Sequence, residues 1–252
     1  MLAAVIGGAL LAAGLGTALV AVPKPSTGME NQTFGLMTSL PIYRAPKASV
    51  AEALAAQDGA GQPHWLRQVV EARNSLDPVD LLDSASLAKL DYLLLVQPRA
   101  LTPGENVALD EWVRAGGQVL LVADPMLITE PRFALGDPRN PQAISVTGPI
   151  HARWGLELEP GIDGDARESL ADLGAARLPV VLGGSFAKRP PEGGDPADCD
   201  LYAERVVAVC TIGEGRAVLV ADATMFERAS PSSDAEAAFW ALLGMMRDGP
   251  EG

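Results

Sequence analysis

Residues 90–125, LDYLLLVQPRALTPGENVALDEWVRAGGQVLLVADP, decide the fold of this chain. Leu93 to Val96 form an unbroken apolar run that is too short for a helix and is followed by Pro98, which is typical of a strand buried on both faces. Val119 to Ala123 form a second run of this kind, and Asp124-Pro125 ends it. Both runs therefore predict strands from the interior of a sheet.

The segment between these two strands has the signals of a capped helix. Thr102 can serve as the N-cap, Pro103 occupies the first helical position, and Glu105 completes a capping box. Gly116-Gly117 predicts a left-handed turn at the end of the helix. The predicted apolar face consists of Val107, Leu109, Trp112 and Val113. Strand, helix and strand make a βαβ unit, and such units build parallel sheets.

The rest of the chain alternates short apolar runs with amphipathic stretches. These patterns predict strands at Phe34–Ser39, Leu156–Leu158 and Leu178–Leu182, helices at Ala48–Gln57, His64–Arg73 and Ile144–Trp154, a weak strand or turn at Val79–Leu82, and loops at Ile128–Gln142 and Lys188–Asp200. Long ordered connections such as the first of these loops are often functional.

The carboxyl-terminal third predicts an antiparallel border to the parallel sheet. Val206–Thr211 and Ala217–Ala221 flank IGEGR, residues 212–216, whose glycines permit a tight hairpin. A final helix, Ala235–Met246, is expected to be capped by Asp234. We therefore predict an α/β fold with a mixed, mostly parallel sheet, flanking helices and a C-terminal β-hairpin, in one domain spanning residues 33–248.

Composition narrows the possible functions. The chain has 252 residues, of which 48% are hydrophobic and 20% charged, so it can bury a full core. Its net charge of −13 argues against nucleic acid or an anionic membrane surface as the main partner. Two histidines and two cysteines leave little material for a metal cluster, and we predict neither a metal nor a cofactor. Cys199 and Cys210 either form a disulfide in an oxidising compartment or remain two free thiols.

The amino terminus predicts attachment to a membrane. Met1 to Val22 carry no charge, and this length matches the ~20 apolar residues that span a bilayer. A cleaved signal peptide, with a small-residue site at Gly16-Thr17-Ala18, is the alternative, but the basic n-region is missing. Residues 23–32 form a polar linker, in which Lys24 taken alone favours a cytoplasmic domain. Because amino-terminal anchors usually export the domain attached to them, we expect a single-pass inner-membrane protein with a periplasmic domain.

Three predicted strands end in polar residues that form the candidate ligand-binding site. Gln97, Asp124 and Asp222 each follow an apolar run, and ligands of open parallel sheets bind beyond the carboxyl ends of strands. Two carboxylates and an amide could hold a cation or a polyhydroxylated ligand, or perform acid–base chemistry. The competing interpretation, which the sequence favours, is that each residue caps the turn after its strand, a common role of Asp.

The sequence offers no catalytic residues. Cys210 lies within an apolar strand, Cys199 lies in a Pro/Gly-rich loop, and Ser185 in GGSFA lacks the second glycine of a nucleophile elbow. His151 falls on a predicted helix, where a packed or surface histidine is usual. No P-loop or G-x-G-x-x-G motif is present, although Gly183-Gly184-Ser185 could form an anion-binding nest. We therefore predict that the chain is not an enzyme.

Several segments resemble a known family. Residues 90–125, together with FALGDPRNPQ, LPVVLGGSF and IGEGRAVLVADATMF, are similar to the soluble domain of gliding-motility-type auxiliary components of ABC transport systems, which are related to the amino-terminal domain of intraflagellar-transport proteins. The resemblance covers residues 34–246. It implies a flavodoxin-like, class I glutamine-amidotransferase-like fold without the amidotransferase machinery, and ABC permease and ATPase subunits as partners.

These observations lead to one predicted function and one alternative. The prediction is a membrane-anchored, non-catalytic accessory component of an ABC-type transport or gliding-related system, which binds a ligand or a partner. The alternative is a degenerate amidotransferase or metal-assisted hydrolase that uses Asp124 and Asp222.

Overall fold

A computed structural model describes residues 28–43, 63–134, 136–137, 139–161, 166–191 and 197–249. The span predicted at residues 1–22 and the helix predicted at Ala48–Gln57 lie outside these residues. Within the described part of the chain, no helix combines the length and the apolar character needed to cross a membrane.

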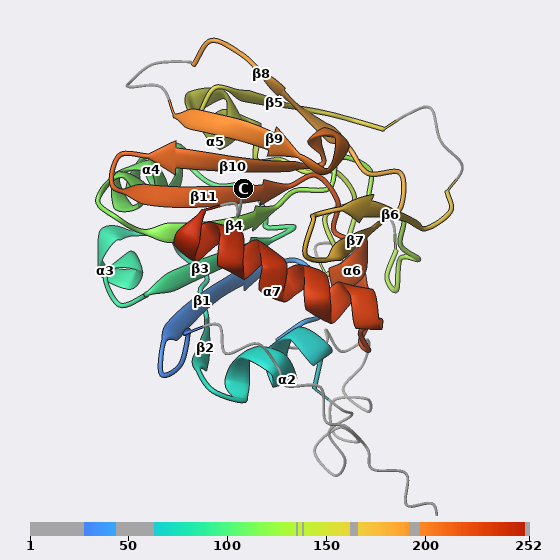
Figure 1. The fold of residues 1–252 in the computed structure, drawn as a ribbon. Helices are drawn as coiled ribbons and strands as arrows, with labels where there is room; N and C mark the ends of the chain where they lie inside the picture. The colour runs from blue at the N-terminus through green and yellow to red at the C-terminus, as the bar shows by residue number, and fades with distance from the viewer. Residues whose placement is uncertain are drawn as a thin grey trace, which may run out of the picture.

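A seven-stranded sheet forms the centre of the molecule, in the order β2-β1-β3-β4-β11-β10-β9 (Figure 1). The strands, in that order, are Ser75–Pro78, Thr33–Thr38, Tyr92–Val96, Gln118–Val122, Gly215–Val220, Val207–Ile212 and Asp198–Tyr202. The five strands from β2 to β11 are mutually parallel, whereas β10 and β9 run antiparallel to their neighbours. The predicted mixed α/β fold with a mostly parallel sheet is therefore confirmed.

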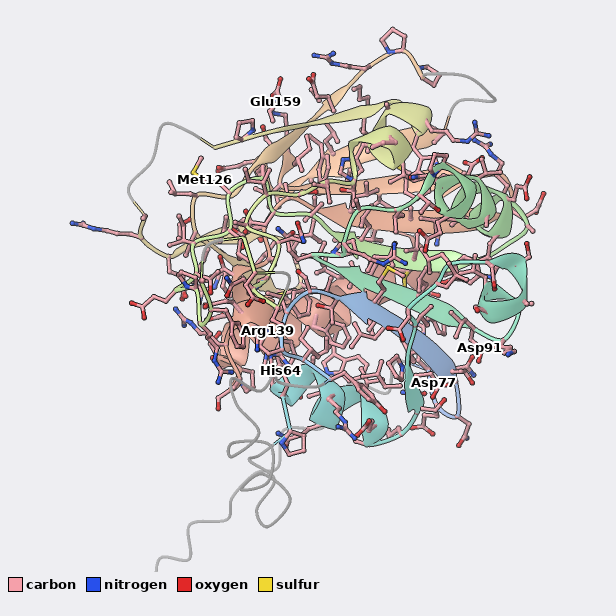
Figure 2. The ribbon with its side chains drawn as sticks, turned by 180° about the vertical axis from the view of Figure 1, so that it is seen from behind. His64, Asp77, Asp91, Met126, Arg139 and Glu159 are labelled. Atoms are coloured by element: carbon pink, nitrogen blue, oxygen red, sulfur yellow. A yellow bond between two sulfur atoms is a disulfide. The ribbon has the colours of Figure 1, made fainter. Side chains whose placement is uncertain are left out.

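Helices cover both faces of this sheet. They are α2 (Trp65–Glu71), α3 (Ser84–Leu87), α4 (Pro103–Arg114), α5 (Gly148–Arg153), α6 (Thr224–Glu227) and α7 (Ser233–Asp248). α7 crosses the near face in Figure 1, and α4 lies on the opposite face, which Figure 2 turns toward the viewer. α2 packs against α6 and α7, because the Trp65 ring stacks on Phe226 with ring centroids 5.7 Å apart and meets Phe239 edge-on at 5.9 Å.

The predicted βαβ unit is present as β3-α4-β4. The Thr102 hydroxyl accepts a hydrogen bond from the Glu105 N–H (3.2 Å), and the Glu105 carboxylate accepts one from the Thr102 N–H (2.9 Å), which confirms the capping box. Gly116 ends the helix at φ +109°. Val107 does not belong to the buried face, since its side chain is 49% exposed. It lies two residues from buried Leu109, about 200° around the helix.

Two small antiparallel sheets flank the main sheet. β5 (Leu156–Glu159) pairs with β8 (Ser185–Lys188), and β6 (Ser169–Asp172) pairs with β7 (Arg177–Val180). The strand predicted at Leu178–Leu182 therefore lies outside the parallel sheet. Its Pro179 lacks a backbone N–H, which disfavours the interior of a large sheet.

Other boundaries differ from the predicted ones for local reasons. The second strand is Ser75–Pro78 rather than Val79–Leu82, because parallel pairing with β1 begins at Ser75. The helix predicted from Ile144 starts at Gly148, since Pro149 suits the first turn of a helix but not its interior. Part of the loop predicted at Lys188–Asp200 is strand, because β9 begins at Asp198 to pair with β10.

The cap of the final helix is Ser232 rather than the predicted Asp234. The Ser232 hydroxyl accepts a hydrogen bond from the Ala235 N–H at 3.1 Å. Asp234 instead occupies the first turn, where a negative charge still interacts favourably with the helix dipole. The predicted apolar side of this helix is confirmed, since Phe239, Leu242, Leu243 and Met246 are fully buried.

A disulfide bond joins Cys199 and Cys210, the chain's two cysteines. The two residues face each other in register on β9 and β10, with a Cα–Cα distance of 3.9 Å. Of the two states that the sequence leaves open, the structure has the disulfide.

Candidate functional site

The three predicted site residues lie together at the carboxyl edge of the sheet. β3, β4 and β11 are adjacent and parallel, so Gln97, Asp124 and Asp222 follow neighbouring strand ends. The Gln97 side-chain amide donates to the Asp124 carbonyl oxygen (3.1 Å), and its oxygen accepts from the Asp124 N–H (2.8 Å). All three side chains are buried, with exposed fractions of 0%, 0% and 1%.

Backbone N–H groups occupy both oxygens of each carboxylate. Asp124 accepts hydrogen bonds from the Met126 N–H (2.8 Å) and the Ala223 N–H (3.1 Å). Asp222 accepts from the Thr224 N–H (2.7 Å) and the Val181 N–H (2.8 Å). These contacts are those of turn-capping residues, and they also tie the ends of β4 and β11 to each other.

The two carboxylates make an unusual electrostatic environment. Burial raises the pKa of Asp222 to about 7, and the negative charge of neighbouring Asp124 contributes to the rise. Burial also raises the pKa of Asp124, opposed by its backbone hydrogen bonds. The Asp222 carboxyl can therefore hold a proton near neutral pH. Because its side chain is almost completely shielded from solvent, a ligand at the surface could not exchange a proton with it directly.

Gln142, at the end of the long connection after β4, links the residues that follow β1 and β3. The Gln97 amide donates to the Gln142 carbonyl oxygen (2.7 Å), and the Gln142 N–H donates to the Ser39 hydroxyl (3.0 Å). That hydroxyl donates in turn to the Gln97 carbonyl oxygen (2.6 Å). Gln97 itself has φ +45°, a left-handed conformation that is rare for residues other than glycine. Ser39, Gln97 and Gln142 thus form a hydrogen-bonded plug, which we call the Gln97 plug.

Sequence reasoning missed two members of this plug. Ser39 marks the predicted end of the first strand, so its position at the carboxyl edge could have been inferred from the topology. Gln142 lies 103 residues from Ser39, in a segment without periodicity, and no sequence signal identifies it.

The same connection borders a cavity of about 180 Å³, which Ser39 also lines. Its charged and aromatic lining residues are Glu130, Arg132, Phe133, Arg139 and Glu227, and residues 39–41 close the other side. The Arg139 guanidinium lies over the Phe133 ring at 4.0 Å. Figure 2 shows Met126 and Arg139 on the opposite side of the molecule from Asp91, which precedes β3. This cavity therefore belongs to the carboxyl edge of the sheet.

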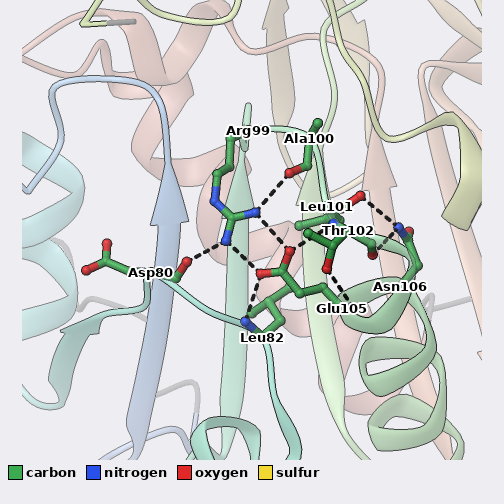
Figure 3. A network of polar contacts seen from close by, with 8 residues as sticks. All are labelled: Asp80, Leu82, Arg99, Ala100, Leu101, Thr102, Glu105 and Asn106. Atoms are coloured by element: carbon green, nitrogen blue, oxygen red, sulfur yellow. Dashed lines mark hydrogen bonds and ion pairs between the residues drawn. The ribbon is translucent and has the colours of Figure 1, made fainter.

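A second polar network braces the same edge beside β2 and β3 (Figure 3). The Arg99 guanidinium pairs with the buried Glu105 carboxylate at 2.6 and 2.9 Å and donates to the Asp80 carbonyl oxygen at 2.5 Å. Glu105 also accepts from the Leu82 N–H (3.2 Å). The Arg99 hydrogen bonds hold the pKa of Glu105 at about 2, so this carboxylate is charged at neutral pH.

The other side chains considered from the sequence, those of Cys199, Cys210, Ser185 and His151, have structural roles or are buried. Cys199 and Cys210 are consumed in the disulfide, and Ser185 begins β8. His151 is buried on α5, and burial lowers its pKa to about 4. Among the described residues, no group of three or more His, Cys, Asp or Glu side chains is arranged to hold a metal ion.

Comparisons with known proteins show similarity of fold. No protein-family model matches the sequence, and no curated protein matches it. The structure is similar to the mmIFT52 N-terminal domain, with a TM-score of 0.55 and 11% sequence identity over 88% of this chain and 100% of that chain. This agrees, at the level of the fold, with the predicted relation to intraflagellar-transport proteins.

Two further solved structures are glycoside hydrolases. They are an exo-β-1,4-mannosidase from Opitutaceae bacterium strain TAV5 (TM-score 0.46, 15% identity, 86% of this chain and 36% of that chain) and a β-galactosidase from Bacillus circulans sp. alkalophilus (TM-score 0.43, 14% identity, 87% and 32%). The chain thus spans about a third of each hydrolase. The prediction that the chain is not an enzyme is contradicted by these enzymes among its structural neighbours. At such identities, however, the likeness assigns neither a reaction nor a catalytic residue to this chain.

Proposed function

We propose that this α/β domain is a partner-binding accessory component of an ABC-type transport or gliding-related system. The observation that carries the proposal is the Gln97 plug together with the cavity outside it. The five parallel strands β2-β1-β3-β4-β11 follow the order 2-1-3-4-5 of flavodoxin-like folds, whose ligands bind at the switch point between β1 and β3. Here Gln142, at the end of the long connection, bridges the ends of β1 and β3, so we assign recognition to the residues of that connection that line the neighbouring cavity.

The lining of that cavity has features suited to a protein partner. Arg139 lies over Phe133 while its guanidinium pairs with Asp137 at 2.7 Å, which fixes a large planar surface in place. Both side chains lie beside Arg132 and Glu130 in the cavity lining. Arginine and aromatic side chains are enriched where protein interfaces carry most of their binding energy. The alternative, a hydrolase using Asp124 and Asp222, has less support because backbone N–H groups occupy all four carboxylate oxygens.

Two further features support the proposed relation to gliding-motility-type components and the proposed periplasmic location. The likeness to the mmIFT52 N-terminal domain covers that domain completely, as expected for a gliding-motility-type auxiliary component with an amidotransferase-like fold. The Cys199–Cys210 disulfide favours an oxidising compartment, in line with a periplasmic domain on a single inner-membrane anchor. Because the sequence has no P-loop, ATP hydrolysis would be performed by a separate ATPase subunit.

Crosslinking in native membranes, followed by affinity purification of the full chain, tests this proposal. We expect recovery of an ABC permease and its ATPase with the unmodified chain. The double variant Phe133→Ala/Arg139→Ala should reduce that recovery at least tenfold. Lys89→Ala, which changes an exposed residue beyond the amino end of β3, is the matched control and should leave recovery unchanged. Recovery of neither subunit with the unmodified chain, or equal recovery with the double variant, would overturn the proposal.

A further inference from the structure

The chain enters the described domain at the amino edge of the main sheet, the edge at which its parallel strands begin. Thr33 starts β1, and its N–H donates to the carboxylate of Asp91, which precedes β3, at 2.7 Å. Met29 is buried, with 1% of its surface exposed, and the Asn31 N–H donates to the Arg73 carbonyl oxygen at 2.9 Å. These contacts hold the entry point of the chain against the amino edge.

The carboxyl end of the described domain lies beside this entry point. A Cβ atom on Gly28 would lie 2.7 Å from Nη1 of Arg247, which is in the last turn of α7. Arg216, the second residue of β11, donates to the carbonyl oxygens of Met246 at 3.3 Å and Arg247 at 3.0 Å. The last turn of α7 is therefore tied to the start of a central strand, and both ends of the described domain lie at the amino edge.

The candidate interaction surface lies at the opposite, carboxyl edge. The cavity of about 180 Å³ is at this edge, and the connection after β4 exposes large apolar side chains there. Ile128, Ile144 and Val146 have exposed fractions of 50%, 64% and 39%, and Ile144 also borders a second cavity of about 490 Å³. Figure 2 shows Met126, from the same connection, on the opposite side of the molecule from Asp91. Exposed apolar groups gathered beside cavities are typical of an interaction surface.

The tether between the predicted membrane span and the domain is short. Five residues, 23–27, separate the span predicted at residues 1–22 from Gly28. At about 3.5 Å per residue, the chain from Val22 to Gly28 reaches at most about 20 Å. A compact domain of about 220 residues has a radius of gyration of about 17 Å, and hence a diameter of about 45 Å. The tether is therefore too short to carry Gly28 across the width of the domain, so the edge beside Gly28 stays nearest to the membrane.

We propose that the amino edge of the sheet faces the bilayer and that the carboxyl edge binds a water-exposed domain of the transporter, not its membrane-spanning helices. This inference rests on the proposed function, which includes the amino-terminal anchor. The amino edge suits a position beside lipid head groups because charges at the two chain ends are paired there. Glu30 pairs with Arg73 at 2.7 Å, and Arg247 pairs with Asp248. The apolar surface that a protein partner would cover lies at the other edge.

Resonance energy transfer to labelled lipid measures this orientation directly. The two native cysteines form a disulfide, so a single introduced cysteine takes a maleimide donor dye without reductant. Lys89→Cys and Glu214→Cys place the dye at exposed positions of the amino edge, and Ile128→Cys and Ile144→Cys place it at the carboxyl edge. The full chain is reconstituted in phosphatidylcholine vesicles that carry an acceptor on their head groups. We expect the transfer efficiency at positions 89 and 214 to be at least twice that at positions 128 and 144.

The orientation is overturned if the chain does not float with the vesicles, if all four positions transfer equally, or if the carboxyl-edge positions transfer more.

A photocrosslinker on Ile144→Cys in native membranes tests the partner. We expect crosslinked permease peptides to lie outside the membrane-spanning helices, and crosslinks within those helices overturn the inference. Recovery of no permease contradicts the proposed function, whereas the vesicle measurement still decides the orientation. The two failures are therefore distinguishable.

Discussion

Glu105 shows how one side chain can serve a helix and the tertiary structure together. Its carboxylate closes the capping box of α4 with Thr102, and the same group accepts from the Leu82 N–H and pairs with Arg99 (Figure 3). The capping role follows from local spacing and was predictable. The other contacts were not predictable. The Leu82 N–H comes from a segment 23 residues earlier and meets Glu105 only in the folded structure, and no regular spacing identifies the ion pair with Arg99 across the connection between β3 and α4.

Glu105→Gln should destabilise the protein at neutral pH. The amide keeps one acceptor for a backbone N–H but loses the ion pair, and hydrogen bonds to charged groups contribute about 1.5–3 kcal/mol. Because Arg99 is 41% exposed, solvent screening places the expected loss at the lower end of that range. Urea unfolding at pH 7 measures it. Glu111→Gln, an exposed position on the same helix, is the control and should change little.

The same pair predicts a pH dependence with a defined sign. The pKa of Glu105 is held at about 2, below its ordinary value of 4.5. A depressed carboxyl pKa contributes stability that is present above pH 4.5 and is lost as the pH falls toward 2. The difference in free energy of unfolding between the unmodified chain and Glu105→Gln should therefore shrink between about pH 5 and pH 3. A difference that grows over this interval would contradict the ion pair.

Asp222 should show the opposite pH dependence. Its pKa is raised from the ordinary 3.8 to about 7, so the folded state binds more protons than the unfolded state between these values. The stabilising contribution is complete below pH 3.8 and is lost as the pH rises through 7, by up to about 4 kcal/mol at 1.36 kcal/mol per pKa unit. Asp222→Asn cannot titrate. The stability advantage of the unmodified chain over this variant should therefore be larger at pH 5 than at pH 8.

At the scale of elements, sequence patterns predicted the strands that end at the carboxyl edge of the sheet, but not the path of the connection that crosses this edge. The apolar runs that end at Gln97, Asp124 and Asp222 identified three strands, because a buried strand has an unbroken apolar sequence, and the structure places their ends at one edge. The connection Ile128–Gln142 has no period. Its path depends on hydrogen bonds to Ser39 and Gln97, which are distant in sequence, so only the folded sheet brings its partners within reach.

Gln97 should control how firmly this connection is held. Gln97→Ala removes its bonds to Asp124 and Gln142 and should cost about 2–3 kcal/mol at ~1 kcal/mol per hydrogen bond. We expect limited trypsin digestion to cleave the connection faster, at Arg132 or Arg139. Gln97→Gly loses the same side chain but relieves the positive φ, so it should be more stable than Gln97→Ala by about 1 kcal/mol. Unchanged trypsin cleavage in Gln97→Ala would show that the plug does not hold the connection.

At the scale of the whole molecule, the central sheet contains strands that the sequence predicts and one outer strand that it does not. The parallel strands and the antiparallel β10–β11 hairpin follow from patterns that the sequence predicts, whereas the outermost strand, β9, begins inside a segment predicted as a loop. Of its five residues, Cys199 and Leu201 are the apolar ones at alternating positions. Asp198 and Asp200 are exposed, and Tyr202 is half-buried. Apolar patterning is therefore too weak to identify the strand, and its register opposite β10 is established by tertiary pairing and by the disulfide.

The disulfide should make the stability of the whole molecule sensitive to reductant. It closes a loop with a sequence separation of 11 residues, for which loss of unfolded-state entropy corresponds to about 3 kcal/mol. Thermal unfolding with and without dithiothreitol should show a lower melting temperature in the reduced protein. The double variant Cys199→Ser/Cys210→Ser should melt near the reduced value and should not respond to reductant. Because such bonds persist in oxidising compartments, native protein from its own membrane should resist alkylation at both cysteines. Complete alkylation without prior reduction would contradict both the disulfide and the proposed periplasmic location.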